Sequence, residues 1–155
     1  MPNAPDFDLQ AAHRYFSAAC FNRAWELIDQ PNRTPAENEE MLRLSLASAW
    51  HWSQRPDCAP ANLSIGTWQT ARIYTLLGQV ENARRYGQLC LEISRGAEIS
   101  PFYLGYAYEA LARVEALAGD KKKMEQYLNE ALRAAAGLTD LEDKEQLIAD
   151  LETIH

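Results

Sequence analysis

Histidine and cysteine side chains offer this chain's clearest routes to metal binding or nucleophilic chemistry. They are His13, His51 and His155, together with Cys20, Cys58 and Cys90. No H-E-x-x-H or C-x-x-C motif occurs, no two histidines lie four residues apart, and nothing in the spacing favours a Cys–His nucleophile. His13 and Cys20 would share a helical face only if one helix continued through Ala19. The sequence therefore predicts no metal, no cofactor and no catalytic residue, and the chain is not expected to be an enzyme.

Trp50, His51 and Trp52 are three consecutive residues with large rings. Neighbouring residues of a helix point about 100° apart, so the three rings cannot all face one core. We expect Trp52 to form the wall of a groove, with His51 beside it. Two alternatives stay open: Trp50 packs inside while His51 is an ordinary surface residue, or an exposed ring forms a homodimer contact.

The composition is that of a globular protein. The chain has 155 residues, of which 47% are hydrophobic and 24% charged, so we predict a single domain over residues 1–155. A net charge of −7 argues against binding nucleic acid or an anionic membrane surface. Neither a signal peptide nor a membrane-spanning run is visible, and the odd number of cysteines is typical of reduced thiols in the cytoplasm.

Helix signals occur along the whole chain, and strand signals are nearly absent. Thr34, Pro35 and Glu37 form a capping box that predicts a long helix over residues 35–53. Thr139 and Glu142 predict another capping box before a last helix over 140–154. We predict an all-α fold of about seven or eight helices. The remaining helices are expected over 7–18, 21–28, 63–77, 79–93, 101–118 and 121–135.

Two segments that lie 41 residues apart repeat one pattern of Ala-Arg, a Gly turn and a second helix. Such a repeated helix–turn–helix is typical of an α-helical repeat protein. The segments resemble tetratricopeptide repeats (TPRs), in which small residues let paired helices approach and an aromatic residue fills the gap between pairs. The matching positions are Ala71, Gly78, Ala83 and Tyr86, then Ala112, Gly119, Met124 and Tyr127.

The TPR resemblance implies a right-handed stack of antiparallel helix pairs. Its repeat-like units would be residues 7–28, 63–93 and 101–135, with 35–53 as an extra helix and 140–154 as a C-terminal capping helix. The first unit is a weaker copy that places Ala19 in its turn. Residues 21–91 also resemble a family of uncharacterised bacterial proteins, on Asn22-Arg23-Ala24-Trp25 and Gly66-Thr67-Trp68-Gln69 among others, and this likeness implies no activity.

In TPR proteins the first helix of each pair lines a concave groove. By the family's register, the groove-facing residues here would be Leu9, His13, Trp68, Arg72, Tyr106, Glu109 and Arg113. A basic strip of His13, Arg72 and Arg113 would suit a carboxylate or an acidic peptide. Alternatively, Arg72 stacks on Trp68 and Arg113 pairs with Glu109, each four residues earlier.

These patterns lead to one functional prediction and two alternatives. We predict a cytoplasmic TPR-like module that binds a protein or peptide in its groove, with Trp52 and Trp68 supplying apolar contact and arginines orienting a carboxylate. The first alternative is a small-molecule-binding protein or enzyme with a polar pocket near His51, Gln69 and Arg72. The second is a structural protein that acts in dimerisation or assembly.

Overall fold

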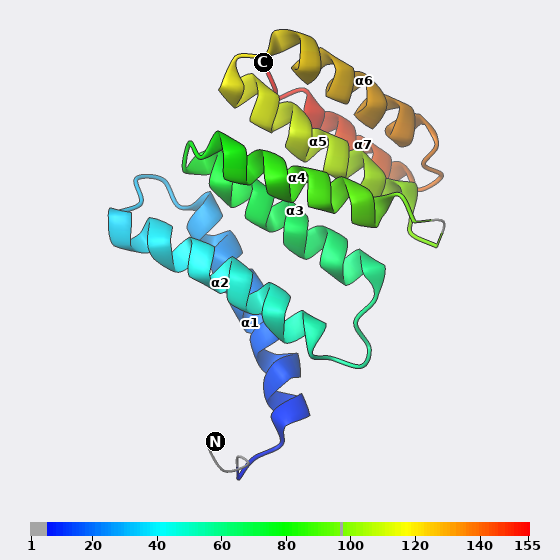
Figure 1. Ribbon diagram of the computed structural model, residues 1–155. Coiled ribbons are helices and arrows are strands. Elements are labelled where there is room, and N and C mark those ends of the chain that lie inside the picture. Colours follow the sequence, from blue (N-terminus) through cyan, green and yellow to red (C-terminus); the bar gives the residue numbers. More distant parts are fainter. Residues whose placement is uncertain (1–5, 97) are drawn as a thin grey trace. The chain divides into compact units, whose positions relative to one another are not determined.

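The computed structural model describes residues 6–96 and 98–155, and within these ranges it contains seven α-helices and no strand. The all-α prediction is therefore confirmed (Figure 1). None of the helices in the described ranges is long and apolar enough to cross a membrane. Residues 1–5, on which the expected absence of a signal peptide partly rests, lie outside the described residues. The helices are α1 (Leu9–Asp29), α2 (Pro35–Ser53), α3 (Pro60–Leu76), α4 (Val80–Ser94), α5 (Pro101–Ala118), α6 (Lys121–Ala136) and α7 (Leu141–Leu151).

Contacts divide the chain into two compact units, which are described separately. Unit 1 is Met1–Ala59 and contains α1 and α2, and unit 2 is Pro60–His155 and contains α3 to α7. A single domain over residues 1–155 stays a prediction.

In unit 1, α1 and α2 form an antiparallel hairpin with Leu27 and Met41 in its interior. Helix α1 runs without interruption from Leu9 to Asp29, so the two helices expected over 7–28 are wrong. Nothing at Ala18-Ala19-Cys20 interrupts a helix, because alanine has the highest helix propensity and neither Gly nor Pro occurs there. The N-terminal repeat copy, with its turn at Ala19, is wrong for the same reason.

The turn between α1 and α2 is closed by local polar bonds. The Arg33 guanidinium donates to the carbonyls of Leu27, Ile28 and Gln30 at 2.9, 3.1 and 2.9 Å. These carbonyls stand at the end of α1, where a helix lacks partners for its last acceptors. The Thr34 capping box then starts α2 as predicted, at Pro35.

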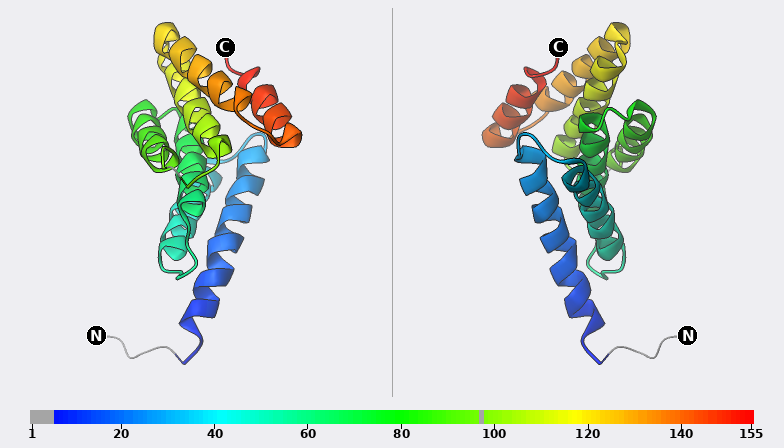
Figure 2. Two further views of the ribbon diagram at one scale, coloured as in Figure 1. Left: turned by 90° about the vertical axis from the view of Figure 1, so that its right-hand side faces the viewer. Right: turned by 90° about the vertical axis from the view of Figure 1, so that its left-hand side faces the viewer.

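In unit 2, each helix packs against the next one along the chain, and α5 also packs against α3 and α7. Figure 2 shows α4 and α7 on opposite sides of α5. The two predicted glycine turns are present: Gly78 and Gly119 have φ angles of 71° and 75°, in the left-handed region where a Cβ is disfavoured. The expected capping box of Thr139 is wrong, because the cap stands one residue later, at Asp140, which accepts from the Asp143 backbone N–H at 3.0 Å.

Close approach of helices in unit 2 depends on two further glycines. A Cβ placed on Gly87 of α4 would lie 2.7 Å from the side chain of Leu111 on α5. A Cβ on Gly105 of α5 would collide with the side chain of Leu147 on α7. Hydrogen atoms in these places therefore let α4, α5 and α7 pack at short range around the core of unit 2.

Candidate functional site

A buried carboxylate on α5 is the centre of the polar cluster in unit 2. Glu109 is 1% exposed, and its Oε2 accepts from the Trp68 indole N–H of α3 at 2.8 Å. Its Oε1 accepts from Arg113, so the alternative that these two residues form an i, i+4 pair is confirmed. Burial raises the pKa of Glu109, and Arg113 followed by Trp68 opposes that rise by favouring the charged form. Glu109 thus connects α3 with α5 from a buried position.

Arg113 also connects α5 with the end of α7. Its Nη2 donates to the Asp150 carbonyl at 3.0 Å and to the Thr153 hydroxyl at 2.8 Å. The side chain is 13% exposed. Because its donors serve Glu109 and α7, any role of Arg113 toward a ligand stays a prediction.

Arg72 of α3 has different surroundings. It follows Trp68 by four residues, so the two share one face of α3. In the part of the chain that the structure describes, its guanidinium makes no hydrogen bond and no ion pair, although the side chain is half-buried. Burial and then the positive charge of Arg113 lower the pKa of Arg72, whereas the Glu109 and Asp150 carboxylates act against this change. Arg72 therefore differs from Arg113, whose guanidinium binds Glu109 and the end of α7.

Tyr106 of α5 lies beside Trp68, with its ring at an edge-to-face distance of 5.6 Å between centroids. Its hydroxyl donates to Asp150 Oδ2 at 2.5 Å, and burial together with this bond raises the pKa of Tyr106. The structure thus brings four of the predicted residues together: Trp68, Tyr106, Glu109 and Arg113. Asp150 and Thr153 were not predicted, because they lie 37 and 40 residues after Arg113 and no local spacing indicates the contact.

Two other predicted residues meet in unit 1. The Nδ1 atoms of His13 on α1 and His51 on α2 lie 2.9 Å apart, so one ring donates to the other. His13 is buried, and burial followed by the charge of His13 lowers the pKa of His51. Helix α1 does continue through Ala19, so His13 and Cys20 stand on one helix. Within the described ranges no group of three metal-ligating side chains is found.

Trp50 and Trp52 differ in exposure, and the alternative in which Trp50 packs inside is wrong. Trp50 is 56% exposed and contacts His13 edge-on, with centroids 5.3 Å apart. Trp52 is half-buried beneath the Arg55 guanidinium, which lies 3.7 Å from its ring centroid. The most exposed ring of the triplet is therefore Trp50, and the role of Trp52 as a groove wall stays a prediction.

The residues of the alternative polar pocket divide between the units. His51 belongs to unit 1, whereas Gln69 and Arg72 belong to unit 2. Gln69 is fully buried within α3 and offers no surface to a ligand. Leu9, which was predicted to face the groove, lies exposed at the start of α1.

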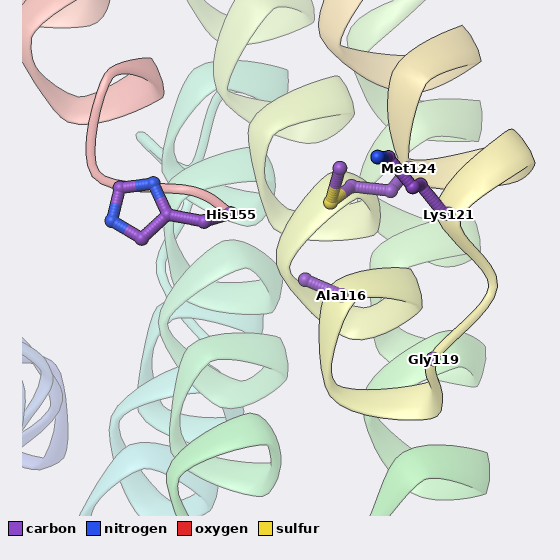
Figure 3. Close-up of a pocket in the computed structure, with 5 residues that line it drawn as sticks. All are labelled: Ala116, Gly119, Lys121, Met124 and His155. Carbon is purple, nitrogen blue, oxygen red and sulfur yellow. The ribbon is translucent and has the colours of Figure 1, made fainter.

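A cavity of about 260 Å³ lies at the turn between α5 and α6. Figure 3 shows its lining residues, which are Ala116, Gly119, Lys121, Met124 and His155. None of the residues predicted for the groove or for the alternative polar pocket is among them. The cavity is thus separate from the polar cluster around Glu109.

Comparisons with protein-family models, with curated proteins and with solved structures found no match for this chain.

Proposed function

We propose that this chain is a TPR-like binding module that holds a carboxylate-bearing peptide or protein segment against α3 and α5. The order of packing in unit 2 supports this proposal: successive helices contact one another, and α3, α5 and α7 contact in turn. The left-handed glycines at the α3–α4 and α5–α6 turns fit helix pairs of the TPR kind. In this arrangement α7 is the capping helix.

The observation that carries the proposal is that the Arg72 guanidinium has no hydrogen-bonded acceptor among the described residues. The side chain of Arg72 is half-buried, but its guanidinium nitrogens are not among the fully buried polar atoms of the described residues, so a ligand can reach these donors. A ligand carboxylate would supply two acceptors in the geometry that a guanidinium prefers. Trp68, on the same face of α3, would supply apolar contact.

A binding measurement with two peptide pools tests the proposal. One pool holds fluorescein-labelled octapeptides rich in Asp and Glu, and the other holds the matching Asn and Gln peptides. We expect the acidic pool to raise the fluorescence anisotropy at lower protein concentration. Arg72→Gln should weaken its binding by about tenfold, which corresponds to one lost charged hydrogen-bonding contact.

The matched control is Arg133→Gln on α6, since Arg133 pairs with Glu130 at an exposed position. It removes the same charge and should leave the affinity unchanged. Equal binding of the two pools, or equal affinity of Arg72→Gln and wild type, would refute the proposal.

The proposed module acts without catalysis and resides in the cytoplasm. All three cysteines are free thiols in the part of the chain that is described. A reducing compartment keeps such thiols from forming disulfides.

A second candidate function, assembly through unit 1, is favoured by exposed aromatic rings. Tyr15, Phe16 and Trp50 are 66%, 44% and 56% exposed. Such rings are enriched at protein interfaces. Light scattering after size-exclusion chromatography tests this function. A wild-type dimer that becomes a monomer when Trp50→Ser and Phe16→Ser are combined supports it. A wild-type protein that is monomeric at high concentration contradicts it.

A further inference from the structure

Asp150 on α7 presents a fixed carboxylate next to the Arg72 site. Its Oδ2 accepts from the Tyr106 hydroxyl at 2.5 Å. Its backbone carbonyl accepts from Arg113 at 3.0 Å and from the Thr153 hydroxyl at 2.6 Å. These bonds hold both the main chain and the side chain of Asp150 in place.

The second oxygen of this carboxylate keeps its acceptor capacity. In the described ranges Asp150 Oδ1 takes part in no hydrogen bond and no ion pair, and Asp150 is only partly buried. Tyr106, which binds Asp150, packs edge-to-face on Trp68. Trp68 precedes Arg72 by four residues on α3, so Asp150 belongs to the same cluster as Arg72. Its negative charge favours the charged form of that guanidinium. The two groups nevertheless form no ion pair in the part of the chain described. The Asp150 carboxylate and the Arg72 guanidinium therefore belong to one cluster but do not bind each other in the described residues.

Charge balance shows which ligand such an arrangement accommodates. The cluster joined by these bonds contains two cations, Arg72 and Arg113, and two carboxylates, Glu109 and Asp150. A lone ligand carboxylate would leave one excess negative charge in a partly buried place close to Asp150, where like charges repel strongly. A ligand with one negative and one positive group keeps the cluster balanced.

We propose that the site recognises a mixed-charge peptide segment, in which an Asp or Glu carboxylate binds Arg72 and a neighbouring Lys or Arg side chain binds Asp150. This inference rests on the proposed function, because it needs Arg72 to bind a carboxylate. Asp150 is then the residue that determines specificity, and Tyr106 positions it.

Labelled octapeptide pools of different charge test this inference by anisotropy. The mixed pool combines Glu with Lys, the acidic pool combines Glu with Gln, and the basic pool combines Lys with Gln. We expect wild type to bind the mixed pool about tenfold more tightly than the acidic pool, as one added charged contact would produce. The basic pool should bind weakly, since it offers no carboxylate to Arg72.

Asp150→Asn should abolish the preference for the mixed pool without weakening the binding of the acidic pool. An asparagine oxygen can still accept from Tyr106, so the local structure is expected to persist. The matched control is Glu145→Gln, an exposed carboxylate on the same helix, and it should keep the preference. Tyr106→Phe keeps the charge of Asp150 but removes the bond that fixes it, so the preference should fall by less.

The outcomes separate the two proposals. If Asp150→Asn and Tyr106→Phe both leave the ratio of the two affinities unchanged, the inference is wrong. If Arg72→Gln still weakens both pools in that case, the proposed function stands. If Arg72→Gln changes neither affinity, both proposals fail. Circular dichroism of each variant checks that the helices are intact, and Tyr106→Phe decides the inference if Asp150→Asn does not fold.

Discussion

Replacing Glu109 with glutamine tests whether the polar cluster of unit 2 is a structural link between its helices. Each oxygen of Glu109 accepts one bond, from Arg113 and from Trp68. A glutamine oxygen can serve one of these donors, and the amide N–H groups then point at the other. The variant also leaves the Arg113 charge without its buried counterion.

The expected loss follows from the burial of the pair. Removing one partner of a buried ion pair costs about 3–5 kcal/mol. Arg113 is 13% exposed and keeps its bonds to Asp150 and Thr153, so the lower end of this range applies. We expect the free energy of unfolding of unit 2 to fall by about 3 kcal/mol.

Urea unfolding measures this loss, with Trp68 fluorescence as the probe. The other three tryptophans, Trp25, Trp50 and Trp52, lie in unit 1, so their replacement by Phe leaves a reporter for unit 2 alone. The control is Glu130→Gln, which removes a carboxylate paired with Arg133 at an exposed position. Exposed pairs contribute about 0–1 kcal/mol, so the control should unfold almost like wild type. If the two variants lose the same stability, the structural role of Glu109 is refuted.

Two further predictions concern packing and protonation. The pKa of His51 is lower in the folded chain than its ordinary value of 6.5. As the pH falls below 6.5, the unfolded chain therefore binds more protons than the folded chain, and the free energy of unfolding of unit 1 declines until the pH passes the folded pKa. The urea midpoint of unfolding should fall between about pH 7.5 and pH 5 for wild type, and it should fall less for His51→Phe, which keeps only the His13 ring. An equal change of the midpoint with pH in both proteins would contradict this prediction. Gly105→Ala should destabilise unit 2 by about 1–3 kcal/mol because its Cβ meets Leu147. Gly66→Ala, whose Cβ meets nothing within 4 Å, should stabilise it by about 0.5–1 kcal/mol, and thermal melts that rank the two alike would refute the packing argument.

Features whose cause lies within a few residues could be predicted from the sequence. The start of α2 is fixed by Thr34 and Glu37, which bond each other's backbone groups. The glycine turns follow from the need for a left-handed residue at Gly78 and Gly119. The pair of Arg113 with Glu109 follows from spacing along one helix.

Features that depend on distant parts of the chain could not be predicted. The contact of His13 with His51 joins residues 38 apart, and neither position indicates it by type or spacing. The division of the N-terminal segment into two helices followed the repeat pattern and not the local propensity, which favours one continuous helix. Asp150 belongs to the cluster because α7 packs on α5. This packing needs a residue without a side chain at Gly105, and no sequence pattern around Gly105 indicates it.

Arg72 and Arg113 occupy equivalent places in the repeated pattern, yet their neighbours give them different roles. Arg113 binds Glu109 of its own helix. Because α7 packs on α5, Arg113 also donates to two acceptors at the end of α7. In the described part of the chain Arg72 forms no ion pair with Glu109, which is bound by Trp68 and Arg113, or with Asp150, whose Oδ2 is bound by Tyr106. Arg113 thus attaches the end of α7 to α5, whereas under the proposed function Arg72 binds the ligand.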